Sequence, residues 1–197
     1  MTNLAEQARR LNRGATTGFA LLTDRDRLPD PLPLLPLLPK GSLVVLRHYG
    51  AADRTTLGHA LARACRARRL VLAVADDLPL AVTLGAGLHL PEHRARAASA
   101  RIRLWHRRTR RLLTVAAHGR MALRRAKTMG ADFAFLSPVF ATASHPGAAT
   151  LGLFRFRNLA RGAPLPVWAL GGTSARTLNS LKESGAAGVA TVGGLIG

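Results

Sequence analysis

Short apolar runs alternate with longer segments of helical periodicity over most of the chain. Eight apolar runs predict buried β-strands: Phe19–Leu22, Leu43–Arg47, Leu70–Ala75, Gly87–Leu90, Leu112–Ala116, Asp132–Ser137, Val167–Leu170 and Gly188–Val192. The segments between them predict helices: Leu57–Arg68, Leu78–Leu84, Arg94–Ala100, Arg120–Met129, Leu153–Leu159 and Ala175–Ser184. Strands that alternate with helices form a parallel sheet, and eight strands close a (β/α)8 barrel. A compact (β/α)8 TIM barrel is therefore predicted, with an open, doubly wound α/β sheet as the alternative.

Two regions depart from this pattern. The segment Pro29–Pro39 holds five prolines, which exclude a normal first helix, so we expect an extended or single-turn loop over the barrel wall. The last predicted strand lies close to Gly197, so we expect a barrel that lacks a normal eighth helix. Residues 4–13, or a partner subunit in a homodimer, could cover the resulting gap. We expect one domain over residues 1–197, with residues 1–17 as an N-terminal extension.

The composition is that of a strongly basic globular protein. Lys and Arg number 29 against 10 Asp and Glu, a formal net charge of +19, while a hydrophobic content of 48% supplies a core and excludes a disordered basic tail. The single cysteine, Cys65, excludes an intramolecular disulfide and a cysteine zinc cluster. No apolar run reaches 18 residues and the N-terminus has no apolar signal region, so we expect a cytoplasmic protein without a membrane span.

The densest positive charge lies between Arg94 and Arg111, a stretch that contains eight arginines together with Trp105 and His106. Guanidinium groups bind phosphates and Trp105 could stack on a base, so a polyanion-binding stripe is one interpretation. A solvated helix and loop on the outside of the barrel is the interpretation that we favour. Either one predicts incidental adhesion to polyanions, and we expect no specific nucleic-acid partner.

Glycine pairs follow the last two predicted strands. Gly171 and Gly172 precede a helix that Ser174 can cap, and Gly193 and Gly194 follow Val192. Bare backbone exposes N–H groups, and the seventh and eighth loops of such barrels commonly bind phosphate. The alternative is that the glycines only make tight turns. We predict a phosphate site that includes these residues: Gly171, Gly172, Val192, Gly193 and Gly194.

Two histidines follow predicted strands, where a barrel places its catalytic residues. His118 follows the fifth strand, and His145 lies after the sixth with the hydroxyls of Thr142 and Ser144 nearby. Imidazole accepts and donates protons near neutral pH, so both are acid–base candidates. His89 lies inside the fourth strand. No HExxH or comparable spacing indicates a zinc site.

Several motifs together resemble the thiamine phosphate synthase family, whose superfamily also contains the thiazole tautomerases. They extend from about residue 19 to residue 192: Thr23-Asp-Arg, Leu46-Arg47, Gly87-Leu-His-Leu-Pro, the segment Ala131–Thr142, and the tail from Ala169-Leu-Gly-Gly to Val192-Gly-Gly. The resemblance implies the barrel fold and a phosphorylated thiazole as ligand. The synthase joins a pyrimidine pyrophosphate to that thiazole phosphate with Mg²⁺, and it requires two acidic metal ligands.

The resemblance also shows departures at the pyrophosphate end. Asp76 matches the first acidic position, but the second is occupied by His93. Arg47 retains a cationic position, while the family's neighbouring Gln and Lys correspond to Val45 and Tyr49. We therefore expect no metal site, because Asp76 would face His93 and supply one carboxylate at most. We also expect no cofactor, with Mg²⁺ required only if the chain is a synthase.

Two further departures belong to the same pyrimidine pyrophosphate half, while the thiazole phosphate half of the pattern is retained. The pyrophosphate-binding Lys corresponds to His145, and a Ser before the fifth-strand histidine corresponds to Ala116. The pattern resembles the tautomerases more closely, which implies proton transfer by His118 without a metal. Substrate contacts are then implied at Arg47, Asp76, Thr142, Ser144 and His145. A true synthase and a non-catalytic ligand-binding barrel are the alternatives.

Overall fold

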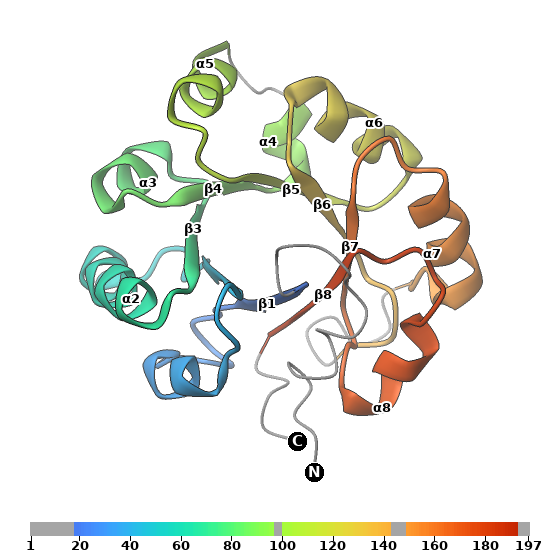
Figure 1. Cartoon of the computed structure of the whole chain (residues 1–197), viewed down its shortest axis with the longest axis horizontal. Coiled ribbons are helices and arrows are strands. Elements are labelled where there is room, and N and C mark those ends of the chain that lie inside the picture. Colours follow the sequence, from blue (N-terminus) through green and yellow to red (C-terminus); the bar gives the residue numbers. More distant parts are fainter. Residues whose placement is uncertain (1–17, 97–99, 143–148, 193–197) are drawn as a thin grey trace.

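The structure is a computed structural model that describes residues 18–96, 100–142 and 149–192. Eight parallel strands follow one another around a closed barrel (Figure 1). Their bounds are β1 Phe19–Leu22, β2 Leu43–Leu46, β3 Val71–Ala75, β4 Gly87–Leu90, β5 Leu113–Ala117, β6 Phe133–Leu136, β7 Val167–Leu170 and β8 Gly188–Thr191. Pairing of β1 with β8 closes the barrel. The predicted (β/α)8 fold is confirmed, and the open doubly wound sheet is wrong.

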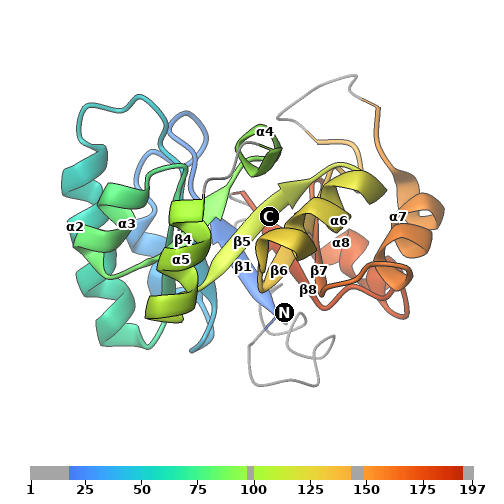
Figure 2. The same cartoon turned by 90° about the horizontal axis from the view of Figure 1, so that it is seen from above.

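Helices cover the outside of the barrel (Figures 1 and 2). Their bounds are α2 Arg54–Arg68, α3 Leu78–Leu84, α4 Glu92–Arg96, α5 Ala100–Thr109, α6 Arg120–Met129, α7 Gly152–Arg161 and α8 Ala175–Leu178, with 3-10 helices η1 Leu32–Leu37 and η2 Asn179–Leu181. Within the described ranges, none of these helices is long and apolar enough to cross a membrane. The suggestion that residues 4–13 cover the gap beside β8 falls outside the described part of the chain.

Two predicted elements require correction, and a third is only partly described. The proline segment forms the 3-10 helix η1, which buries Leu34 and Leu35, instead of an extended or single-turn loop. The predicted helix Arg94–Ala100 lies partly outside the described residues: the structure has α4 up to Arg96 and α5 from Ala100, and residues 97–99 between them are not described. The predicted helix Ala175–Ser184 is shorter, since α8 ends at Leu178 and continues only as η2. The Ser174 cap of α8 is confirmed.

The interior of the barrel is packed with side chains. Alternate residues of each strand point inward, and Phe133 stacks on Trp168 with ring centroids 4.3 Å apart. Phe135 meets the same indole edge-on at 6.0 Å, and the adjacent strand carries Gly188, where a Cβ atom would lie 2.6 Å from the Trp168 ring. Side chains fill the barrel below its mouth, so the residues that follow the strands must form any ligand site.

Candidate active site

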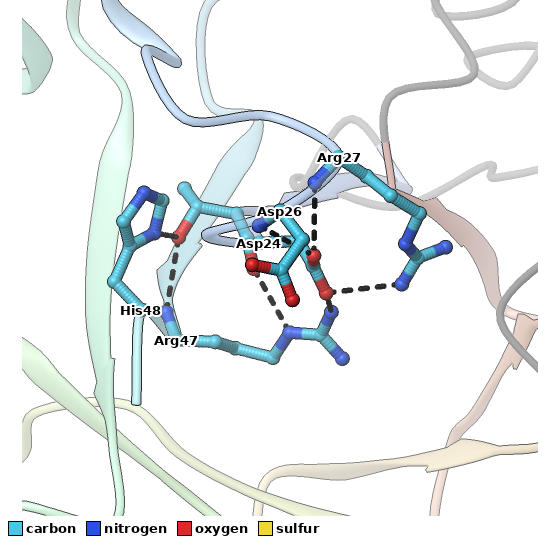
Figure 3. Close-up of polar contacts among 6 residues, drawn as sticks. Asp24, Asp26, Arg27, Arg47 and His48 are labelled. Carbon is cyan, nitrogen blue, oxygen red and sulfur yellow. Dashed lines mark hydrogen bonds and ion pairs between the residues drawn. The ribbon is translucent and has the colours of Figure 1, made fainter. Parts of the chain in front are cut away.

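The mouth of the barrel is formed by residues that directly follow the strands. Thr23 follows β1 and is fully buried. Its hydroxyl oxygen accepts a hydrogen bond from the Arg47 backbone N–H at 3.0 Å and lies 2.8 Å from Nδ1 of His48. Nε2 of His48 lies 3.1 Å from the Pro29 carbonyl oxygen. Polar contacts therefore hold the loop after β1 against the end of β2 (Figure 3).

Arg47 extends from the end of β2 toward Asp24 and Arg27 (Figure 3). Its Nη2 lies 2.6 Å from Oδ2 of Asp24, and its Nε donates to the Thr23 carbonyl at 2.9 Å. Arg27 reaches the same Asp24 oxygen at 3.0 Å. Burial alone would raise the pKa of Asp24, but hydrogen bonds and charge from Arg27, with the charge of Arg47, hold it below its usual value. Two guanidinium groups thus share the Asp24 carboxylate.

Asp76 follows β3 and faces a cation. Its Oδ2 lies 3.1 Å from Nε of Arg94, and its backbone N–H donates to the His89 carbonyl at 2.8 Å. The partner of the Asp76 carboxylate among the described residues is therefore Arg94, and the predicted juxtaposition with His93 stays a prediction. His93 is exposed on the short helix α4, and Arg94, the next residue of that helix, binds the Asp76 carboxylate.

The residues around Asp76 do not fit a magnesium ion. Mg²⁺ requires several oxygen ligands in near-octahedral geometry, and the nearby Asp77 instead binds Arg54 at 2.9 Å and caps α3 through the Leu80 N–H. No group of three or more His, Cys, Asp or Glu residues is gathered within the described ranges. A guanidinium beside Asp76 also repels a cation.

His118 is exposed directly after β5, at the mouth where it was predicted. Its Nδ1 lies 2.7 Å from the Ser137 carbonyl oxygen at the end of β6. A carbonyl oxygen only accepts, so in the neutral ring Nδ1 carries the hydrogen and Nε2 carries the lone pair. The His118 backbone N–H donates to Glu92 at 3.0 Å, which fixes the residue's position. The backbone contact therefore sets the tautomer of the neutral ring, with Nε2 as the nitrogen without a hydrogen.

The first glycine pair meets the loop that follows β6. Gly171 has φ +96 and Gly172 has φ +65, values that favour glycine. The Gly171 carbonyl accepts from the Phe140 N–H at 3.0 Å, and a Cβ atom on Gly172 would collide with the Ala141 carbonyl oxygen. The pair therefore allows two loops to approach closely, which is a packing role that neither sequence interpretation contained.

Replacing Gly172 with Ala is expected to destabilise the fold. The substitution adds overpacking, which typically costs about 1–3 kcal/mol, to the strain of a positive φ. Gly152 is a matched control, because it has φ +66 but, apart from its chain neighbours and its own helix, no atom of the described residues lies within 4 Å of the position that an added methyl carbon would take. Urea unfolding should show a larger loss for Gly172→Ala than for Gly152→Ala. Equal losses would contradict the collision.

The other predicted site residues are only partly described. Val192 is half-buried and packs against the interior cluster at the end of β8, and Thr142 is half-buried after β6. The predictions for Ser144, His145 and the glycine pair 193–194 lie outside the described residues. Their roles in binding phosphate or substrate stay predictions.

Sequence reasoning missed three side chains that organise the mouth. Arg54 donates to the Arg47 carbonyl at 3.0 Å and joins the ends of β2 and β3 through the Ala75 carbonyl at 2.5 Å. Glu92 binds Arg125 at 3.1 Å as well as the His118 N–H, and Arg94 binds Asp76. Arginine is so frequent in this chain that no local pattern distinguishes these positions.

Together the fold and the mouth define a (β/α)8 barrel with its candidate site at the carboxyl ends of the strands. A family model described as thiamine monophosphate synthase matches residues 35–195, and the chain belongs to that family. The structure of thiamine phosphate pyrophosphorylase from Pyrococcus furiosus superimposes with a TM-score of 0.72 at 20% identity, over 94% of this chain and 87% of that one. This likeness concerns the fold.

Curated relatives carry the synthase name. Thiamine-phosphate synthase of Synechococcus sp. (strain WH7803) is 32% identical over 158 residues, which are 79% of this chain and 44% of that protein. Putative thiamine-phosphate synthase 2 of Aquifex aeolicus is 30% identical over 162 residues, 79% of this chain and 84% of that one. The chain thus spans less than half of the Synechococcus relative. These names favour the synthase alternative over the tautomerase interpretation.

Proposed function

We propose that this barrel binds a phosphorylated thiazole and moves a proton on its ring, with His118 as the acid–base group. The observation that carries the proposal is the 2.7 Å contact from Nδ1 of His118 to the Ser137 carbonyl, which leaves Nε2 as the base at the mouth. Proton transfer near neutral pH requires a group that both accepts and donates, and imidazole does so. The reaction needs no metal, in keeping with a mouth that does not fit one.

The phosphate of this ligand is proposed to bind at the ends of β7 and β8. In support, the backbone N–H of Gly172 donates to no acceptor within the described residues. Glycine backbone at the seventh and eighth loops is a recurrent phosphate site in barrels. Because substitution of Gly172 would disturb packing, the direct test is a phosphate-soaked crystal. Density for the anion against Gly172 supports the site, and a pocket blocked by side chains contradicts it.

The synthase reaction is the second candidate, and two observations favour it: the names of the curated relatives and the retained Arg47 at the end of β2. It would join a pyrimidine pyrophosphate to the thiazole phosphate and would depend on Mg²⁺ carried by the pyrophosphate. A non-catalytic ligand-binding barrel is the remaining alternative.

One pair of assays on the purified full chain separates these functions. The first follows conversion of the thiazole phosphate tautomer in EDTA, and the second follows thiamine phosphate formation from both substrates with Mg²⁺. We expect turnover in the first and none at ordinary enzyme rates in the second. Turnover only in the second assay would establish the synthase reaction, and activity in neither would indicate a non-catalytic barrel.

A further inference from the structure

An arginine and a carboxylate pair at the ends of two neighbouring strands, β3 and β4. Asp76 follows β3 directly and has φ +53, and Arg94 lies on α4, which begins just after β4. Figure 2 shows α4 beside the end of the barrel to which the β5 arrow points. The Arg94 side chain is 61% exposed and that of Asp76 is 23% exposed. The guanidinium is therefore anchored on one side and open to solvent on the other.

The contact uses only part of the guanidinium. Nε of Arg94 donates to Asp76, and the two terminal nitrogens have no partner within the described residues. Those nitrogens carry four N–H groups in a planar fork, an arrangement that suits oxyanions. Helix α4, which carries Arg94, is held as well, because Glu92 at its start accepts hydrogen bonds from the His118 N–H and from Arg125.

Other cations lie on the same side of the mouth. The guanidinium carbon of Arg54 lies over the Tyr49 ring, 5.8 Å from the ring centroid. Burial raises the pKa of Tyr49, and the charges of Arg47, Asp76 and Arg54 also act on it, so these groups surround one phenol. The nearby acids are already engaged, since Asp24 binds two arginines and Asp77 binds Arg54.

We propose that Arg94, anchored by Asp76, is the cation of a metal-free oxyanion subsite for a phosphate or carboxylate group of the ligand. A divalent ion that bridges acids and a ligand oxyanion would need the position beside Asp76, and the guanidinium takes it. The subsite concerns binding alone and does not depend on proton transfer by His118.

Calorimetric titration of the full chain with inorganic pyrophosphate tests the subsite. We expect the wild type to bind pyrophosphate in EDTA, with no requirement for Mg²⁺. Arg94→Gln should weaken binding about tenfold or more, because a charge-assisted hydrogen bond is lost. Arg101→Gln, an exposed arginine on α5, is the charge-matched control and should bind as the wild type does. Wild-type binding that requires Mg²⁺, or equal losses in both variants, would overturn the proposal.

A second variant tests whether Arg94 excludes the metal. Arg94→Asp places two carboxylates side by side, so we expect it to bind Mn²⁺ in an electron paramagnetic resonance titration while the wild type does not. The double variant Arg94→Asp, Asp76→Asn should lose that binding. Equal Mn²⁺ affinity in the wild type and in Arg94→Asp would overturn the proposal. Both readouts measure binding, so failure of the proton-transfer assay leaves them interpretable.

Discussion

His118→Gln is expected to lower turnover of the thiazole phosphate tautomer by about 10²–10⁴-fold, the usual contribution of general acid–base catalysis. Glutamine retains polar contacts at the mouth but cannot exchange a proton near neutral pH, so affinity for the phosphorylated thiazole should stay close to that of the wild type. Initial rates under saturating substrate measure the first quantity, and calorimetric titration measures the second.

Three variants serve as controls for that result. His93 is exposed on the same rim, and His93→Gln should keep full activity. Ser137→Ala should keep most activity, because the Ser137 carbonyl lies 2.7 Å from Nδ1 of His118 whereas its hydroxyl lies 3.4 Å away. His145→Gln tests the rival base. Full activity in His118→Gln with collapse in His145→Gln would move the acid–base role to His145.

The strands could be predicted because each one is a short buried run whose ends coincide with a change in polarity. Phe19–Leu22, Gly87–Leu90 and Val167–Leu170 have the predicted bounds, and each of the other strands differs from prediction by one residue at one or both ends. Helix α5 could not be placed in this way. It buries no residue fully, and Ile102 and Trp105 pack only partly against the core. Most of its residues are arginine or otherwise polar, so few apolar positions mark it in the sequence.

The rim positions of the site could also be predicted, since parallel strands place the residues that follow them at one end of a barrel. His118, Arg47 and Asp76 all lie there. Their partners could not be predicted, because a long arginine side chain reaches across elements. Arg94 meets a carboxylate 18 residues earlier in the chain. The close approach of Gly172 to Ala141 likewise depends on how two loops pack.

Acid is expected to destabilise the fold through His89, which lies inside the barrel and is only 4% exposed. Its Nδ1 lies 2.9 Å from the Thr114 hydroxyl, and its ring meets Phe135 edge-on at 5.4 Å. Burial lowers the pKa of His89 to about 3, and the positive charge of Arg47 acts in the same direction. The imidazole is therefore neutral in the folded chain at every pH at which the protein is handled.

The pH dependence follows from the pKa of about 6.5 that the same side chain has in the unfolded chain. Between about pH 6.5 and pH 3 the unfolded state binds the extra proton, so the free energy of unfolding falls as the pH falls, by at most about 1.4 kcal/mol per pH unit. The contribution of His89 is complete above about pH 6.5. From about pH 7.5 to about pH 5.0 the expected loss is about 2 kcal/mol.

Urea unfolding of the wild type and His89→Asn at those two pH values measures this loss. Asparagine can donate to or accept from the Thr114 hydroxyl but does not titrate, so His89→Asn should lose about 2 kcal/mol less than the wild type on acidification. The lowered pKa of Asp24 affects stability only at pH values below this range, since its carboxylate ionises well under about pH 5 in both states. If the His89→Asn variant were as sensitive to pH as the wild type, the proton taken up on unfolding would therefore belong to another group.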